Sequence, residues 1–167
     1  SSSGRGWANL SNAPFRMYKR YTHEGGVATP LIVHWPAGVN AKGKLRHAPS
    51  HLIDIAPTCL AAAGLEGEGM EGESLLPVFA KDQKQERTLF WEHEGNRAVR
   101  KGDYKLVAMH NTPWELYDMS KDRSELKDLA SAMPKKTTEL RSAWEAWAKR
   151  VGAKPWDEVN VKKNKKK

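Results

Sequence analysis

The stretch "NRAVRKGDYKLVAMH", residues 96–110, decides what the second half of this chain can form. Its two halves each alternate apolar with polar side chains, the pattern of a β-strand with one covered face. Gly102 and Asp103 lie between them, and a Gly-containing pair between two alternating runs favours a tight hairpin turn. The sequence therefore predicts an antiparallel hairpin here.

The segments on either side enlarge this hairpin into a small sheet. "TLFWEHE" at 88–94 and "PWELYDM" at 113–119 are short apolar and aromatic runs bounded by turn residues. Pro134 then favours the start of a helix, and Trp144 and Trp147 fall on its apolar stripe. We expect both indoles to pack on the sheet rather than to stack on a ligand, because burying a large side chain contributes roughly 2 to 3 kcal/mol.

The first half of the chain has a different character. "TPLIVHWP", residues 29–36, is a compact apolar run with Pro near both ends, which predicts a buried strand of a covered sheet. Asp54 can cap a helix over 55–63, and Gly64 suits the left-handed position after it. Cys59 falls on the apolar side of that helix and is interpreted as a core residue.

Charge and apolar content narrow the possible partners. The chain of 167 residues has a formal net charge of +8, but five of these charges are lysines at 162–167, a pattern typical of a solvated end. No apolar run approaches the roughly 20 residues that span a bilayer, so we expect no membrane partner. Cys59 is the single cysteine, which excludes an internal disulfide.

Six segments then occur in a particular order. They are Lys19-x-x-x-x-Glu24-Gly25-Gly26, "ATPLIVHWP", "HLIDIAPTCLAAAGL", "GESLLP", "NRAVRKGDYKLV" and "WELYDMSKDRSELKDLA". Together they resemble the C-terminal third of the sulfatase family, specifically the arylsulfatase-like members of the alkaline-phosphatase-like superfamily. Each segment is a weak signal alone, but the six in this order are a strong one.

The resemblance implies an α/β fold and a division of the chain. Residues 1–80 would be the incomplete end of the main sulfatase α/β domain, and 81–155 a C-terminal antiparallel sheet packed by a helix. Residues 156–167 would be a basic, disordered tail. The opening residues contain neither Met nor an export segment, so we expect a longer polypeptide whose N-terminal part completes the fold.

The resemblance also assigns site residues. In the family the lysine of the first pattern reaches the sulfate group, so Lys19 receives a catalytic and substrate-binding role. An ammonium suits this role because it is a compact charge with three rotatable donors. His23 could help to bind the substrate, or could lie on the surface or line the core. His93 could line the substrate pocket or lie on the surface. Gly25 and Gly26 would permit a close approach of the backbone.

The family hydrolyses sulfate esters with a formylglycine and a divalent cation, usually Ca²⁺. Neither group has its residues here: Cys59 is followed by "LAAA" instead of the Pro-x-Arg type of motif, and "SSSGR" at 1–5 lacks the central Pro or Ala. The resemblance thus places the formylglycine and the Ca²⁺ ligands outside this chain, and we expect no metal site within it. The expected partner is a small-molecule or carbohydrate sulfate ester, and the expected location is periplasmic or secreted.

Two alternatives stay open at this stage. The chain could be a basic module that holds nucleic acid or a sulfated polysaccharide through Arg16, Lys19, Arg20 and the lysines at 162–167. It could instead belong to an inactive or phosphoester-hydrolysing relative. The aromatic residues are not clustered as in nucleic-acid binders, so nucleic acid is not the expected partner.

Overall fold

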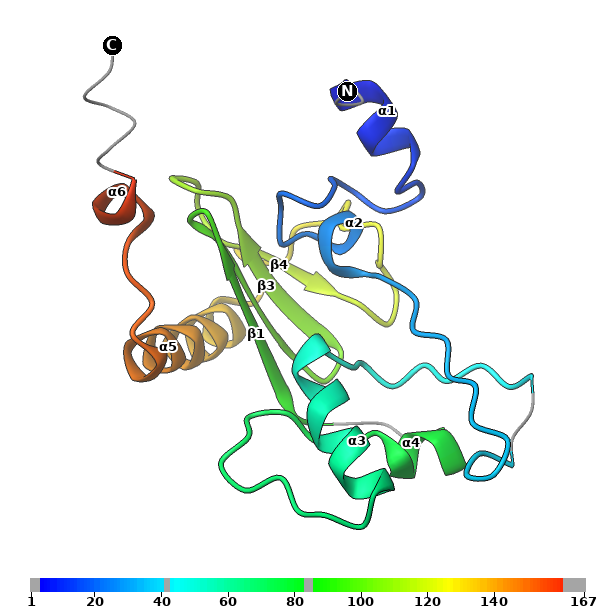
Figure 1. Cartoon of the computed structure of the whole chain (residues 1–167). Coiled ribbons are helices and arrows are strands. Elements are labelled where there is room, and N and C mark those ends of the chain that lie inside the picture. The colour runs from blue at the N-terminus through cyan, green and yellow to red at the C-terminus, as the bar shows by residue number, and fades with distance from the viewer. Residues whose placement is uncertain (1–3, 41–42, 83–85, 161–167) are drawn as a thin grey trace. The chain divides into compact units, whose positions relative to one another are not determined.

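The computed structural model describes residues 4–40, 43–82 and 86–160 (Figure 1). Contacts between residues divide the chain into two compact units. The first unit joins Ser1–Thr29 to Arg87–Lys167, and the second is Pro30–Glu86. The N-terminal segment therefore groups with the C-terminal part of the chain, and the expected domain division of the longer protein stays a prediction.

A four-stranded antiparallel sheet forms the centre of the first unit, with the strand order β1-β2-β3-β4. The strands are β1 (Thr88–His93), β2 (Asn96–Lys101), β3 (Tyr104–Ala108) and β4 (Glu115–Asp118). Lys101 pairs with Tyr104 across a two-residue turn, and Gly102 has a φ of 56°. The predicted hairpin is confirmed, because this left-handed turn geometry favours glycine.

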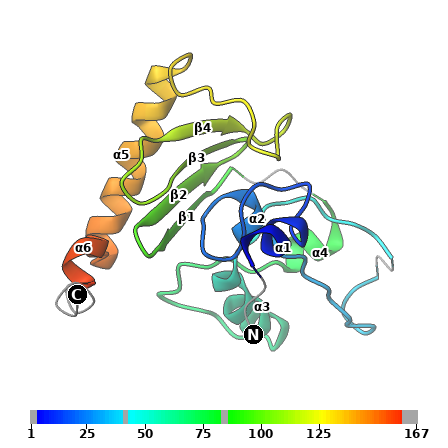
Figure 2. The same ribbon diagram turned by 90° about the horizontal axis from the view of Figure 1, so that it is seen from above.

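The longest helix, α5 (Pro134–Val151), covers one face of the sheet (Figure 2). It begins at the predicted proline. Its fully buried Leu140 joins the core on this face, which also contains Val99, Leu106 and Leu116. The two indoles pack on the sheet as expected: Trp144 Nε1 donates to the carbonyl of Trp91, 3.0 Å away, and Trp147 stacks on Phe90 with ring centroids 5.1 Å apart.

The N-terminal segment of the first unit lies against the other face, so that α2 and α5 are on opposite sides of the sheet (Figures 1 and 2). Three short helices complete this unit: α1 (Arg5–Leu10), α2 (Glu24–Val27) and α6 (Trp156–Val159). An apolar cluster of Ala98, Val107, Tyr117 and Met119 lies on this face. The same face also buries the charged residue Lys105, whose partners belong to the candidate site.

The second unit is organised around a buried carboxylate. Its helices are η1 (Leu52–Asp54), α3 (Ile55–Ala62) and α4 (Leu76–Ala80). Asp54 accepts hydrogen bonds from the backbone N–H groups of His51 and Glu73, at 2.7 and 3.1 Å. Thr58 donates to the Asp54 carbonyl and accepts from the N–H of Leu75. These bonds tie α3 to the chain before α4 and satisfy polar groups that are costly to bury unpaired.

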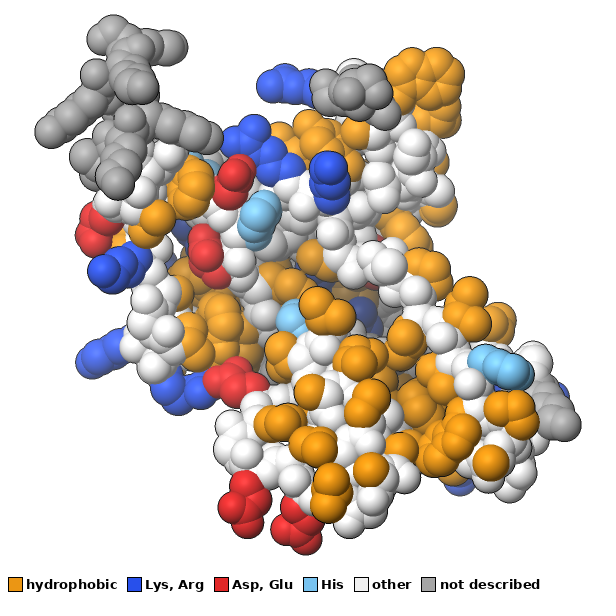
Figure 3. Space-filling model, viewed as in Figure 1, with side chains coloured by type: hydrophobic (Ala, Val, Ile, Leu, Met, Phe, Trp, Pro, Cys, Tyr) orange, Lys and Arg blue, Asp and Glu red, His pale blue; other side chains and the backbone are white. Residues whose placement is uncertain are grey.

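The structure corrects two expectations about this unit. Residues 29–36 form no strand, and the side chain of Ile32 is 90% exposed. A strand is stabilised by pairing with a neighbour, and the described residues pair no strand with this segment. Apolar side chains consequently gather on the surface of the second unit (Figure 3).

The second correction concerns the buried face of α3. Pro57 and Thr58 are buried, whereas Ile55 and Cys59 are exposed. The interpretation of Cys59 as a core residue is therefore wrong within this chain. The buried face was decided by the hydrogen bonds of Thr58, which the apolar pattern could not show. Gly64 does follow the helix with a φ of 73°, as predicted.

The C-terminal end of the chain is described as far as residue 160. Residues 156–159 form α6, while 161–167, which contain the five lysines, lie outside the described residues. Among the helices that are described, none combines the length and apolar character that a membrane-spanning helix requires.

Candidate functional site

The candidate site is built on the loop of residues 16–26, here called the Lys19 loop. Its two ends meet, because the N–H of Gly25 donates to the carbonyl of Arg16 at 2.9 Å. A side chain on Gly25 would collide with the backbone of Met17 and Arg16, and one on Gly26 with that of Tyr21. The glycine pair is thus needed for close approach of two chain segments, as the sequence indicated.

Lys19 lies in the middle of this loop with its side chain exposed. Its ammonium makes no hydrogen bond or ion pair with residues 4–40, 43–82 and 86–160. The backbone beside it is anchored: Asn96 Nδ2 donates to the carbonyl of Arg20 at 3.2 Å, and Arg20 pairs with Glu94 at 2.9 Å. The structure therefore holds the backbone next to a charged side chain that has no partner among the described residues.

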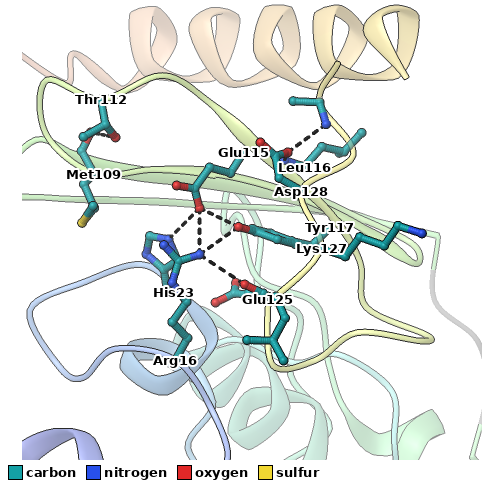
Figure 4. A network of polar contacts seen from close by, with 12 residues as sticks. Arg16, His23, Met109, Thr112, Glu115, Leu116, Tyr117, Glu125, Lys127 and Asp128 are labelled. Carbon is teal, nitrogen blue, oxygen red and sulfur yellow. Dashed lines mark hydrogen bonds and ion pairs between the residues drawn. The ribbon is translucent and has the colours of Figure 1, made fainter. Parts of the chain in front are cut away.

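The start of the loop is attached to β4 by a polar network (Figure 4). Arg16 Nη1 lies 3.0 Å from Glu115 Oε2 and donates to the hydroxyl oxygen of Tyr117 at 2.8 Å. Tyr117 in turn donates to Glu115 Oε2 at 2.6 Å. Burial would raise the pKa of Glu115, but the hydrogen bonds from Tyr117 and Arg16 outweigh it and lower that pKa. Glu115 is therefore ionised at neutral pH.

His23 lies inside this network with no exposed surface. Its Nε2 is 3.4 Å from Glu115 Oε2, and its Nδ1 has no hydrogen-bond partner among the described residues. Burial lowers the pKa of His23, which keeps the ring neutral at neutral pH. His23 is therefore a buried member of the Lys19 loop, next to Glu115 of β4.

The end of the loop is attached by a second, deeper cluster of charges. Glu24 Oε2 lies 3.3 Å from Lys105 Nζ, and Glu24 Oε1 lies 2.7 Å from Arg123 Nη2. Glu125 contacts the same lysine at 2.8 Å and accepts from the N–H of Glu24 at 2.8 Å. Burial would raise the pKa of Glu24, but Lys105 and Arg123 outweigh it, so that pKa is lowered.

His93 ends β1 and is exposed. Its carbonyl accepts a hydrogen bond from Asn96 Nδ2 at 2.9 Å, and the same amide donates to Arg20. One buried side chain therefore ties the backbone of His93 to the backbone beside Lys19. The structure thus brings two of the predicted site residues to the same hairpin end, and buries the third, His23.

Sequence reasoning missed the residues that support this loop. They are Asn96, Lys105, Glu115, Tyr117, Arg123 and Glu125. One signal was available: Lys105 occupies a covered position of an alternating strand, and a lysine there needs a buried carboxylate as its partner. Its partners come from distant parts of the chain, so the pattern could not say which carboxylates they are.

The described residues do not form a metal centre. They bring together no group of three or more His, Cys, Asp or Glu side chains that could hold an ion. Cys59 is exposed on α3 without the motif of a formylglycine precursor. The part of the chain that the structure describes therefore fits neither the Ca²⁺ nor the formylglycine of the family.

Several known proteins resemble this chain in sequence and in structure. An uncharacterized sulfatase of Schizosaccharomyces pombe is 30% identical over 166 residues, which is 89% of this chain and 30% of that protein. The N-acetylgalactosamine-6-sulfatase of Mus musculus is 34% identical over 67% of this chain and 22% of its own length. The crystal structure of Ps i-CgsB matches 84% of this chain and 34% of its own, with a TM-score of 0.72 and 27% identity.

A second structure of Ps i-CgsB, in complex with k-i-k-neocarrahexaose, matches 69% of this chain and 27% of its own, with a TM-score of 0.59 and 26% identity. The chain spans about a third or less of the proteins that it matches. The sheet and the long helix that covers it thus define the C-terminal portion of a sulfatase, with an α/β fold. Residues 15–146 match the family described as N-sulphoglucosamine sulphohydrolase, C-terminal, and the chain belongs to that family.

Proposed function

We propose that the full-length protein hydrolyses a sulfate ester to an alcohol or phenol and sulfate, and that Lys19 binds the sulfate group. The observation that carries this proposal is the state of the Lys19 loop. The Arg16 side chain, before Lys19, and the Arg20 carbonyl, after it, are both hydrogen-bonded to the sheet, while the Lys19 ammonium has no partner among the described residues. A charged donor that is held in place but left unpaired suits an anionic ligand.

The chemistry of Lys19 fits the proposed reaction. The sulfate group of an ester is anionic, and negative charge builds on the leaving oxygen as its bond to sulfur breaks. An ammonium beside these oxygens donates hydrogen bonds and offsets the charge in both states. Exposed His93, at the end of β1, is proposed to contact the organic part of the ester. His23, being buried, is proposed to support the loop rather than to touch the substrate.

The other parts of the site are proposed to lie elsewhere in the longer protein. The Ca²⁺ ligands and the formylglycine precursor belong to that part in this proposal, because the described residues fit neither group. When bound, Ca²⁺ polarises sulfate oxygens and the formylglycine supplies a nucleophile. We expect this chain alone to have no sulfatase turnover, and we propose a periplasmic or secreted location for the whole protein.

A sulfated carbohydrate is the proposed substrate class. One relative is named for a sulfated amino sugar, and one structural neighbour has been solved with k-i-k-neocarrahexaose. An exposed lysine and histidine at one hairpin end could serve such a ligand, since sugars present hydroxyl groups around a sulfate. Aryl sulfates are the alternative substrate class, and the assay includes one for comparison.

A binding module is favoured less by the geometry. Of the basic residues in the Lys19 loop, Arg16 pairs with Glu115 and Arg20 with Glu94. Of the cations in this loop, only the Lys19 ammonium has no partner within the part of the chain that the structure describes, whereas binding a polyanion requires several unpaired cations along a surface. We therefore propose neither nucleic acid nor a membrane as the partner. An inactive or phosphoester-hydrolysing relative would be distinguished by the nucleophile in the rest of the protein.

The test is Lys19→Ala in the full-length protein, assayed on sulfated sugars and a chromogenic aryl sulfate. We expect kcat to fall by about 10²- to 10³-fold and KM to rise, because the ammonium contacts both ground and transition states. Lys149→Ala, an exposed lysine on α5, is the matched control and should change neither constant. His93→Ala should raise KM with little change in kcat. Unchanged kinetics of Lys19→Ala would refute the assignment.

A further inference from the structure

Arg123 contacts the chain on both sides of Lys19 at once. It lies in the segment that follows β4, and its Nη2 and Nε are 2.7 and 3.2 Å from Glu24 Oε1, after Lys19 in the chain. The same guanidinium lies over the ring of Phe15, before Lys19, with 4.7 Å from Cζ to the ring centroid. One side chain thus bridges the residue that precedes the Lys19 loop and a residue near the end of the loop.

We propose that Arg123 is a positioning residue that sets the place of the Lys19 ammonium by holding Phe15, just before the Lys19 loop, to Glu24 near the end of the loop. The inference rests on the proposed function, in which Lys19 binds sulfate. Arg123 is suited to this task because a planar guanidinium can bond a carboxylate at its edge while it stacks on a ring with its face.

The contacts of Glu24 and the exposure of Arg123 show what Arg123 adds to this cluster of buried charges. Glu24 uses Oε1 for Arg123 and Oε2 for Lys105. Without Arg123, Glu24 Oε2 would still contact Lys105, an ammonium that Glu24 shares with Glu125. The Arg123 side chain is itself 54% exposed, so its removal opens no core cavity. Arg123 therefore gives Glu24 a second cation and links it to Phe15 from a side chain that lies outside the core.

The hydrogen bonds that close and anchor the Lys19 loop do not involve Phe15, so Arg123 can still affect the position of the loop. Gly25 and Arg16 close the base of the loop, and Asn96 holds the carbonyl of Arg20. Phe15 lies outside that closed base and contacts Arg123 through its ring. If Arg123 is lost, the chain entering the loop at Phe15 loses this support, and displacement of a reacting group by about 1 Å can cost up to 10²-fold in rate.

The experiment is a kinetic double-mutant cycle in the full-length protein with Lys19→Ala, Arg123→Ala and the double variant, assayed on the sulfate ester that the wild type turns over fastest. We expect Arg123→Ala to lower kcat/KM by about 10-fold or more. In the Lys19→Ala background the same change should have no further effect, because the residue acts through that ammonium. Arg123→Lys should recover part of the loss, since it keeps the ion pair but not the stacking.

The matched control is Arg97→Ala. Its guanidinium lies 4.6 Å over the ring of Trp114 and donates to the carbonyl of Thr112, on the face covered by α5. The Arg97→Ala variant therefore removes a ring contact and a guanidinium hydrogen bond at a place away from the Lys19 loop. We expect kcat/KM within about twofold of wild type, with additive behaviour in the cycle. Hydrogen exchange of residues 15–24 should increase in Arg123→Ala and not in Arg97→Ala.

The possible failures are distinguishable. If Lys19→Ala lowers kcat/KM and Arg123→Ala does not, the inference is wrong and the proposed function stands. Losses that add in the double variant also overturn the inference, because Arg123 would then act independently of Lys19. If Lys19→Ala itself has no effect, the proposed function fails and the inference fails with it.

Discussion

Lys105 Nζ lies 2.8 Å from Glu125 Oε1 in a region where both side chains are at most 1% exposed. The lysine projects from β3, and Glu125 follows β4 with a left-handed φ of 56°. Glu24 contacts the same ammonium from the other side at 3.3 Å. A single buried cation thus joins the sheet, the loop after β4 and the end of the Lys19 loop.

Replacing Lys105 should destabilise the protein strongly. Lys105→Met keeps much of the side-chain volume but leaves the carboxylates of Glu24 and Glu125 without this cation, so we expect a loss of about 3 to 5 kcal/mol in the free energy of unfolding. Lys101→Met is the control: its pair with Glu139 is about half exposed, and we expect a change below about 1 kcal/mol. Chemical denaturation of the full-length protein measures both. Similar small losses would contradict the buried-cluster interpretation.

Acid should destabilise the protein in two stages. Burial lowers the pKa of His23, so below about pH 6.5 the unfolded chain binds a proton that the folded state does not. The stability contributed by neutral His23 is complete above that pH and declines below it, by at most about 1.4 kcal/mol per pH unit. Glu24 and Glu115 have lowered pKa values, so their contribution is present above about pH 4.3 and is lost as the pH falls further.

His23→Gln tests the first stage. The variant should show a flatter dependence of melting temperature on pH between 7.5 and 5.5, as measured by thermal unfolding. An identical slope in wild type and His23→Gln would show that another group causes the first stage.

Gly26→Ala should distort the Lys19 loop. An added Cβ would lie 2.7 Å from the Tyr18 carbonyl oxygen and closer still to that of Tyr21, distances that backbone atoms do not tolerate. We expect a fall in melting temperature together with lower kcat/KM in the full-length protein. Gly6→Ala is the control, since its Cβ meets nothing within 4 Å in α1, and it should stabilise by about 0.5 to 1 kcal/mol. Wild-type activity in Gly26→Ala would contradict the structure of the loop.

Leu140→Ala should show how much the packing of α5 contributes. Leu140 has no exposed surface and contacts the core of the sheet, so we expect a loss of about 2 to 5 kcal/mol in the free energy of unfolding. Leu126→Ala removes the same atoms from a side chain that is 81% exposed and should change stability by about 0.5 kcal/mol or less. Equal effects in urea titrations would mean that α5 does not pack as described.

The candidate site could be predicted only in part. The spacing of Lys19, Glu24 and the two glycines, through its resemblance to sulfatases, located the loop. The residues that hold it could not be found in the same way, because Arg16 and Glu115 are 99 positions apart and meet only on the folded sheet. Asn96 was visible as the first residue of a strand, but its bonds to the backbone of Arg20 and His93 depend on where the loop crosses the hairpin end.

What the sequence determined by itself was the local structure. A Gly-Asp pair between alternating runs defined the hairpin at Gly102, and Pro134 defined the start of α5, because turn geometry and helix initiation depend on a few adjacent residues. The tertiary structure alone decided that Thr58 rather than Cys59 is buried, that residues 29–36 form no strand within this chain, and that Lys105 has two carboxylate partners. Burial and pairing depend on which distant groups arrive beside a residue, and one-dimensional spacing does not contain that information.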